Sequence, residues 1–217
     1  MKHHIIYIAS FVALLLLSAC DKGSDYIYPS VILDFLNVTT NSKGAVDTFA
    51  TDNNLIYKVD ADYSKVSLTA NTTQRVVAYY SVNKQAKSDS VGSASIHSMA
   101  KIISSAPRVG NYVWSKDPVT IQSVWKSGHW INLTLGIKIL KGNHYMAFIQ
   151  SGDEIINGQR VITVEVSHDK NGDTEAFTDI VYMSIPLSQY ETAYPAGFTI
   201  NVLIPTSSGI TTYTFTD

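Results

Sequence analysis

Cysteine is almost absent from this chain, because its 217 residues contain only Cys20. One cysteine cannot form an intrachain disulfide, so a hydrophobic core must stabilise the fold even if the protein is exported to an oxidising compartment. Basic residues are not in excess either: 16 Lys and Arg face 18 Asp and Glu, and the formal net charge is −2. Nucleic-acid affinity depends on a basic surface. The composition therefore predicts no nucleic-acid partner.

Long apolar runs are also missing. The longest one covers residues 5–17, whereas a membrane-spanning helix needs about 20 apolar residues. Lys2 precedes this run and a polar segment follows Cys20. A basic start, a short apolar segment and small residues before a cleavage site are typical of a secretory signal peptide.

The segment Leu17-Ser18-Ala19-Cys20 resembles a lipobox. This resemblance implies cleavage before Cys20 and diacylation of its thiol, and two or three acyl chains make a durable membrane anchor. We therefore expect a signal peptide (1–19), a lipid-anchored linker (20–29) and a location in the cell envelope, at the outer membrane. The alternative is an ordinary signal peptide with a chance cysteine. The sequence leaves open whether the domain faces the periplasm or the cell exterior.

Catalytic motifs are lacking as well. The chain contains neither a G-x-S-x-G elbow nor an H-E-x-x-H pair. Four histidines remain after the signal, at positions 97, 129, 144 and 168, and their spacing fits no motif. We therefore expect no enzymatic activity and no cofactor.

The body of the chain has the period-two hydrophobicity of strands, and we expect no helix beyond the signal. The first half contains five short strands with a longer insert, which predicts a small Greek-key barrel of the OB type at residues 30–106; half a sandwich is the alternative. The strand pattern breaks at residues 104–107 (SSAP), where the proline cannot donate a ladder hydrogen bond. Seven further strands predict an antiparallel β-sandwich at 107–217. The expected strands cover 31–40, 46–51, 55–59, 75–82, 96–103, 119–125, 130–140, 144–149, 161–168, 177–185, 198–204 and 210–215.

Several segments, in order along the chain, resemble the NigD-like lipoproteins of Bacteroidales. They are the lipobox followed by residues 25–30 (DYIYPS), then 117–119 (DPV), 121–128 (IQSVWKSG), 168–173 (HDKNGD), 182–187 (YMSIPL) and 213–215 (YTF). The resemblance implies an OB-like barrel followed by a β-sandwich. It implies no set of catalytic residues. His129 and Trp130 depart from the asparagine and tyrosine that are more usual in the family.

Aromatic residues provide the best candidates for binding. Trp125 and Trp130 flank a predicted hairpin turn that includes His129. Exposed aromatic faces stack on sugars or on partner side chains. These three residues are therefore candidate ligand-binding residues, and the alternative is that the rings fill a sandwich core.

Two further candidates come from short patterns. Asp169, Asn171 and Asp173 have the alternating oxygen spacing of a calcium loop, but Thr174 stands where an EF-hand needs glycine. Because Asn-Gly is a strong hairpin signal, we favour a structural turn at 171–172 over a metal site. Ser90, in Asp89-Ser90-Val91, matches the O-glycosylation pattern of Bacteroidetes, although so short a pattern also occurs by chance.

Together these patterns predict a non-enzymatic envelope lipoprotein that acts in recognition or protection, for instance as a bacteriocin-immunity protein. Two alternatives stay open. One is a surface glycan-binding accessory protein of a polysaccharide-uptake system, and the other is a structural scaffold of the envelope. The expected partners are the membrane, through the lipid, and a protein or glycan.

Overall fold

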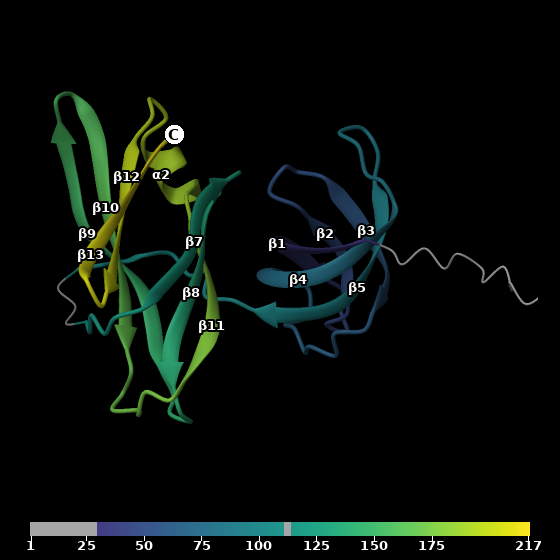
Figure 1. Cartoon of the computed structure of the whole chain (residues 1–217). Coiled ribbons are helices and arrows are strands. Elements are labelled where there is room, and N and C mark those ends of the chain that lie inside the picture. Colours follow the sequence, from purple (N-terminus) through teal and green to yellow (C-terminus); the bar gives the residue numbers. More distant parts are fainter. Residues whose placement is uncertain (1–29, 111–113) are drawn as a thin grey trace, which may run out of the picture. The chain divides into compact units, whose positions relative to one another are not determined.

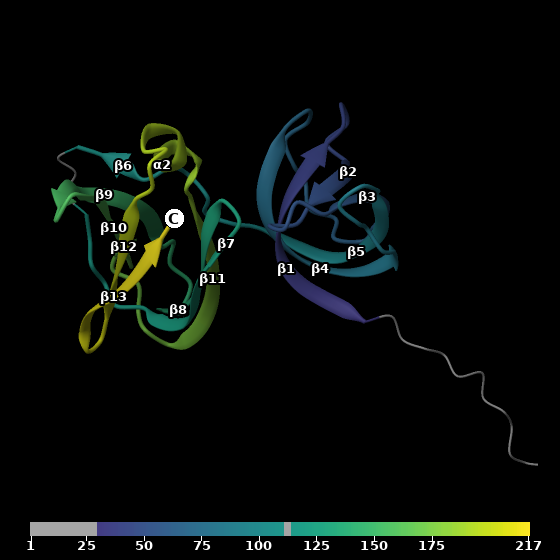
Figure 2. The same cartoon turned by 90° about the horizontal axis from the view of Figure 1, so that it is seen from above.

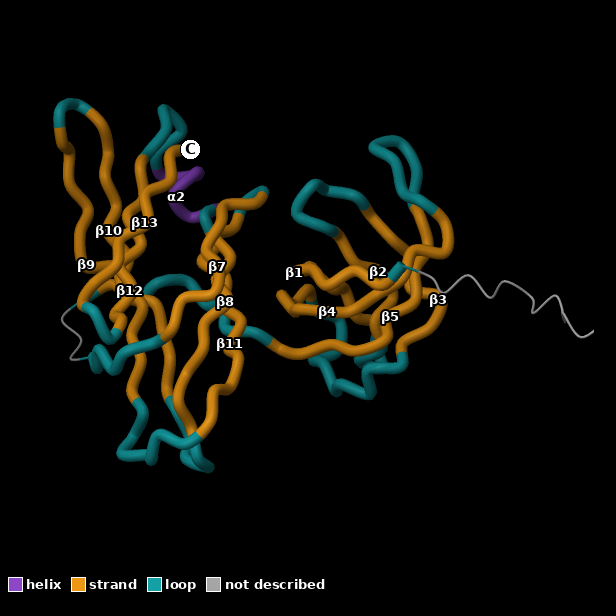
Figure 3. Tube along the Cα trace, viewed as in Figure 1, coloured by secondary structure: helices purple, strands orange, loops and turns teal. Residues whose placement is uncertain are grey.

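Strands make up most of the chain, and loops connect them (Figures 1 and 3). The structure, a computed structural model, describes residues 30–110 and 114–217. The predicted signal peptide (1–19), the linker (20–29) and Cys20 lie outside the described residues. Residues Val31–Asp217 form one compact unit. The predicted domain boundary at 106/107 falls inside this unit and stays a prediction.

The first strands close into a small barrel in the order β1-β2-β3-β5-β4 (Figure 2). This arrangement confirms the predicted barrel in the first half of the chain. β3 and β5 pair in parallel, and the other neighbours pair antiparallel. Alternate residues of β4, such as Val76, Ala78 and Tyr80, point into the core. The strands are β1 (Val31–Thr40), β2 (Val46–Ala50), β3 (Ile56–Asp62), β4 (Thr73–Lys84) and β5 (Gly92–Lys101).

β5 begins four residues before its predicted start at residue 96. Its first residues have small side chains, which give no hydrophobic period to detect. Gly92 is needed there because a Cβ would lie 2.7 Å from the Tyr57 ring and 2.5 Å from the Lys84 carbonyl oxygen. A close approach of this kind is a common reason for glycine in a strand.

The second half forms two sheets, which confirms the predicted sandwich. One sheet has the order β13-β12-β10-β9-β6 and the other β11-β8-β7. Their facing sides bury apolar residues such as Leu133, Phe148 and Val164. The strands are β6 (Arg108–Val109), β7 (Thr120–Ser127), β8 (Trp130–Ile139), β9 (Tyr145–Ile156), β10 (Gln159–Asp169), β11 (Phe177–Pro186), β12 (Thr199–Thr206) and β13 (Gly209–Thr216).

Three features of this half differ from the prediction. β6 is an additional strand, too short to show a period. β9 and β10 extend into a long hairpin around Asn157 and Gly158, which both have positive φ angles (53° and 80°). The polar residues before this turn concealed the strand. Helix α2 (Ser188–Ala193) was not expected; it spans six residues and buries Tyr190.

The predicted turn at Asn171-Gly172 is present, but it does not join two strands that pair with each other. Both residues have positive φ angles (51° and 73°), so the chain does turn there. However, this turn connects β10 to β11, and these strands belong to different sheets. An Asn-Gly pair encodes the local backbone geometry, whereas strand pairing is decided by the two sheets that the loop joins.

Candidate functional site

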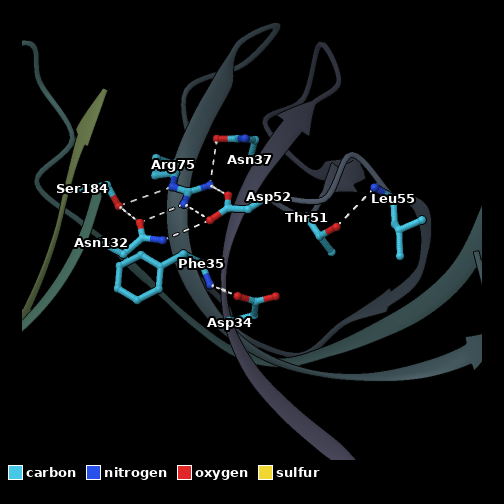
Figure 4. A network of polar contacts seen from close by, with 9 residues as sticks. All are labelled: Asp34, Phe35, Asn37, Thr51, Asp52, Leu55, Arg75, Asn132 and Ser184. Carbon is cyan, nitrogen blue, oxygen red and sulfur yellow. Dashed lines mark hydrogen bonds and ion pairs between the residues drawn. The ribbon is translucent and has the colours of Figure 1, made fainter. Parts of the chain in front are cut away.

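A buried polar network surrounds Arg75 of β4 (Figure 4). Its guanidinium forms a double ion pair with Asp52, through NH1 to Oδ1 at 2.5 Å and NH2 to Oδ2 at 2.9 Å. Only 1% of the Arg75 side chain and 6% of the Asp52 side chain are exposed. Asp52 lies between β2 and β3, so the pair joins two parts of the barrel.

The same network continues into the sandwich. Arg75 NH2 donates to Asn132 Oδ1 of β8 at 3.0 Å, and Arg75 Nε donates to Ser184 Oγ of β11 at 3.4 Å. Asn132 Nδ2 donates to Asp52 Oδ2 at 3.0 Å, and Ser184 Oγ donates to Asn132 Oδ1 at 2.6 Å. Buried charges require partners of this kind, because desolvation is costly. These bonds satisfy the ions and link barrel to sandwich.

Two of the predicted binding residues pack beside this network. The Arg75 guanidinium lies over the Trp130 ring, 4.5 Å from its centroid. The Phe35 ring meets Trp125 edge to face at 5.3 Å. Contacts within the chain therefore cover one face of the Trp130 ring and part of the Trp125 ring. Trp125 is still 36% exposed.

His129, the third predicted binding residue, has a different neighbour. Its Nδ1 lies 2.8 Å from Glu191 Oε2 of helix α2, and 64% of its side chain is exposed.

Trp130 lines a hollow of about 390 Å³. The other lining residues are Asn37, Thr73, Gln74, Arg75, Lys101, Ile102 and Ser104.

A second polar cluster joins two of the histidines. His144 Nδ1 lies 2.8 Å from His168 Nε2. His168 Nδ1 lies 3.1 Å from the Asp117 carbonyl oxygen, which can only accept, so this nitrogen carries a proton. In neutral His168, Nε2 then accepts a hydrogen bond from His144 Nδ1. Burial lowers the pKa of His168, and His144 lowers it further.

The other side of His144 faces Asp173. His144 Nε2 lies 3.4 Å from Asp173 Oδ2, and the same oxygen accepts the backbone N–H of Leu140 at 2.9 Å and of Lys141 at 3.3 Å. The Leu140 bond and other backbone donors hold the pKa of Asp173 well below its usual range. Asp173 thus holds the acidic loop against the loop that follows β8.

The other weak candidates for a calcium site, Asp169 and Asn171, do not join this carboxylate. Asp169 Oδ1 accepts the backbone N–H of Asn171 at 2.8 Å. Lys170 pairs instead with Glu175 at 3.4 Å. Within residues 30–110 and 114–217, no group of three or more His, Cys, Asp or Glu side chains is placed to hold a metal ion. The contacts of Asp169 and Asp173 are those of a structural turn.

Ser90, the predicted glycosylation site, is exposed in a short turn where it bridges to Lys87. Cys20 lies outside the described residues. In the described part of the chain, no helix is long and apolar enough to cross a membrane.

Sequence reasoning missed both polar clusters. Arg75 follows Thr73 and Gln74 in the polar first residues of β4, so the strand pattern gave no sign that it is buried. Its partners Asn132 and Ser184 are 57 and 109 residues away, so no local pattern indicates them. His144 and His168 were treated as isolated residues, although the β9–β10 register brings them together.

The comparisons with known proteins agree with this architecture. Residues 101–216 match the NigD-like C-terminal beta sandwich domain. The chain belongs to the NigD-like family. This match confirms the resemblance found in the sequence. No curated protein matches the chain.

Solved structures from Bacteroidales resemble this NigD-like chain over most of its length. A NigD-like immunity protein from Bacteroides caccae ATCC 43185 is 25% identical, covers 88% of this chain and 94% of its own, and has a TM-score of 0.70. A proposed toxin-related protein from Parabacteroides distasonis ATCC 8503 is 16% identical (87% and 93% covered, TM-score 0.68). A proposed lipoprotein from Bacteroides fragilis NCTC 9343 is 12% identical (86% and 97% covered, TM-score 0.58). The last two likenesses concern the fold alone.

Proposed function

We propose that this chain is a non-enzymatic lipoprotein of the cell envelope that protects the cell by binding a protein partner, as an immunity protein does. The observation that carries this proposal is the 25% identity to the NigD-like immunity protein from Bacteroides caccae across 88% of the chain. The arrangement of polar groups supports it. The buried ions Arg75 and Asp52 are bonded to each other and to neighbouring side chains, which suits a rigid binding scaffold.

The anchor in this proposal is Cys20, acylated at its thiol and exposed to the envelope at the outer membrane. Its test is the intact mass of the membrane-extracted protein. Cleavage before Cys20 and added acyl chains are expected, and Cys20→Ser should abolish both. A mass without acyl chains would contradict the anchor.

Protease treatment of intact cells, with a lysed sample as control, tests which membrane face carries the domain. Digestion on intact cells would indicate the outer surface and favour capture of a partner from outside. Protection until lysis would indicate the periplasm, where an immunity protein meets a toxin that has already crossed the outer membrane.

Protection itself is tested by survival. A strain without the gene should die at lower doses of bacteriocin-containing supernatants from related Bacteroidales, and the wild-type gene should restore survival. The Cys20→Ser form should not restore it if anchoring is required. Equal survival of all strains across such supernatants would contradict the immunity role and leave the scaffold role.

The hollow beside Trp130 favours one second candidate, a glycan-binding accessory function. It combines an aromatic ring with the amide side chains of Asn37 and Gln74 and the amine of Lys101, groups that suit sugar hydroxyls. A glycan array would test this. Binding that Lys101→Ala weakens would support the glycan role, whereas an array without hits would contradict it.

A further inference from the structure

An apolar patch lies at the start of β1. Val31, Leu33 and Tyr79 are large apolar side chains that remain 53%, 43% and 45% exposed. Leu33 pairs directly with Tyr79 of β4, and Val31 pairs with Ser81. Directly opposed residues lie on one face of a sheet, and alternate residues of a strand share a face. The three side chains therefore form one surface, which we call the β1 patch.

The β1 patch lies on the same face of β1 as Phe35, which contacts the sandwich. Phe35, two residues further along β1, is 3% exposed because its ring packs against Trp125 and Tyr182 of the sandwich. Val31 and Leu33 lie beyond this contact and stay open. Exposed aliphatic residues grouped in this way mark a contact surface.

The chemistry of the surroundings indicates what the β1 patch meets. Residues 31–33 and 79–82 contain no charged side chain. On its border, His97 Nε2 lies 2.9 Å from Ser81 Oγ, and the His97 ring stacks on Tyr63 at 6.3 Å. Aliphatic side chains bordered by tyrosines are typical of surfaces that lie in the membrane–water interface.

The length of the chain before β1 restricts the choice of partner. Val31 is the eleventh residue after Cys20, so a fully extended connection would span at most about 40 Å. If Cys20 is acylated, Val31 can never be further than this from the lipid. An anchored patch needs little area to bind, because the anchor already gives it a high effective concentration at the bilayer. A stable dimer would need about 800 Å² per partner, far more than three half-exposed side chains offer.

We propose that the β1 patch of Val31, Leu33 and Tyr79 contacts the surface of the bilayer that holds the anchor. This inference rests on the proposed acylation of Cys20. The contact restricts the orientation of the barrel on the membrane, and it adds a weak second attachment to the lipid.

The test uses the full mature lipoprotein in vesicles of phosphatidylethanolamine and phosphatidylglycerol. In Leu33→Cys the new thiol is the only free one, because the acyl group blocks Cys20, so an environment-sensitive fluorophore labels position 33 alone. Ile210→Cys is the matched control, since Ile210 is 51% exposed on β13. Nitroxide-bearing lipids should quench the label at 33 and shift its emission to the blue, while the label at 210 stays unchanged.

Two further substitutions test whether the β1 patch, and not the fluorophore itself, brings position 33 to the bilayer. Val31→Ser with Tyr79→Ser, in the Leu33→Cys background, should abolish the quenching and leave the circular dichroism unchanged, because both side chains are exposed. Equal quenching at 33 and 210, or none at 33, would overturn the inference. So would quenching that is lost when each vesicle carries a single chain, because a second copy would then cover the patch. Failure of the anchor is distinguishable, since an unacylated Cys20 would take up a second label and lack the acyl mass.

Discussion

The ion pair between Arg75 and Asp52 allows the sharpest test of how this fold is stabilised. Removing one member of a buried pair leaves the other charged and without its counter-ion, which typically costs about 3–5 kcal/mol. Arg75→Met keeps an unbranched apolar stem but removes the charge and every hydrogen bond of the guanidinium. Because Asp52 keeps a bond from Asn132, we expect the lower end, a loss of about 3 kcal/mol in the free energy of unfolding.

Urea denaturation followed by tryptophan fluorescence measures this loss. Trp130, one of three tryptophans, reports on this region because the Arg75 guanidinium lies over its ring. Asp52→Ala completes a double-mutant cycle with Arg75→Met, and direct partners of this kind should show a coupling energy of about 2 kcal/mol. Lys170→Met is the control. It removes an exposed pair with Glu175 and should change stability by less than about 0.5 kcal/mol.

Two results would refute this reasoning. One is a loss below about 1 kcal/mol for Arg75→Met, which would place the pair among ordinary surface salt bridges. The other is strict additivity in the cycle, which would mean that the two residues act separately.

Three further changes have defined outcomes. Because the pKa of His168 is lowered from 6.5, the unfolded chain binds a proton at this residue more readily than the folded chain does. Stability should therefore fall as the pH drops below 6.5, until the folded pKa is reached. His168→Gln should reduce the drop in urea midpoint between pH 7 and pH 5, and an equal drop in wild type and variant would contradict this. Gly128→Ala should lower the melting temperature more than Gly172→Ala, because both glycines have positive φ but only the Gly128 Cβ would clash, 2.5 Å from the Asp52 carbonyl oxygen; equal shifts would disprove the clash. Phe148→Ala should cost about 3–5 kcal/mol in urea denaturation, since Phe148 is fully buried, and a loss near 1 kcal/mol would mean that the core refills the cavity.

Most strands could be predicted because the fold repeats a local signal. In β8 the apolar residues Ile131, Leu133 and Leu135 alternate with polar or small ones, and in the structure they form the core side of the strand. Where side chains are small, as at the start of β5, or polar, as near the end of β9, the signal vanishes although backbone pairing continues. Strand boundaries therefore failed where pairing depends on the partner strand.

The candidate site was less accessible to sequence reasoning. The turn between Trp125 and Trp130 was predicted correctly, since β7 ends at Ser127 and β8 starts at Trp130. What each aromatic ring contacts depends on residues of the barrel, about 50 positions or more earlier in the chain. The His144–His168 pair similarly depends on the β9–β10 register. Local spacing contains no information about such pairs.

The sheet order also determines which half can fold first when the chain emerges from its amino terminus during synthesis. All five barrel strands lie within residues 31–101, so the barrel can close, and Arg75 can find Asp52, as soon as this segment has emerged. The sandwich must wait, because β10 pairs in parallel with β12, which ends at Thr206. Non-local pairing of this kind is slow. Until it is complete, the face of the barrel that later contacts Asn132 and Ser184 stays exposed to water.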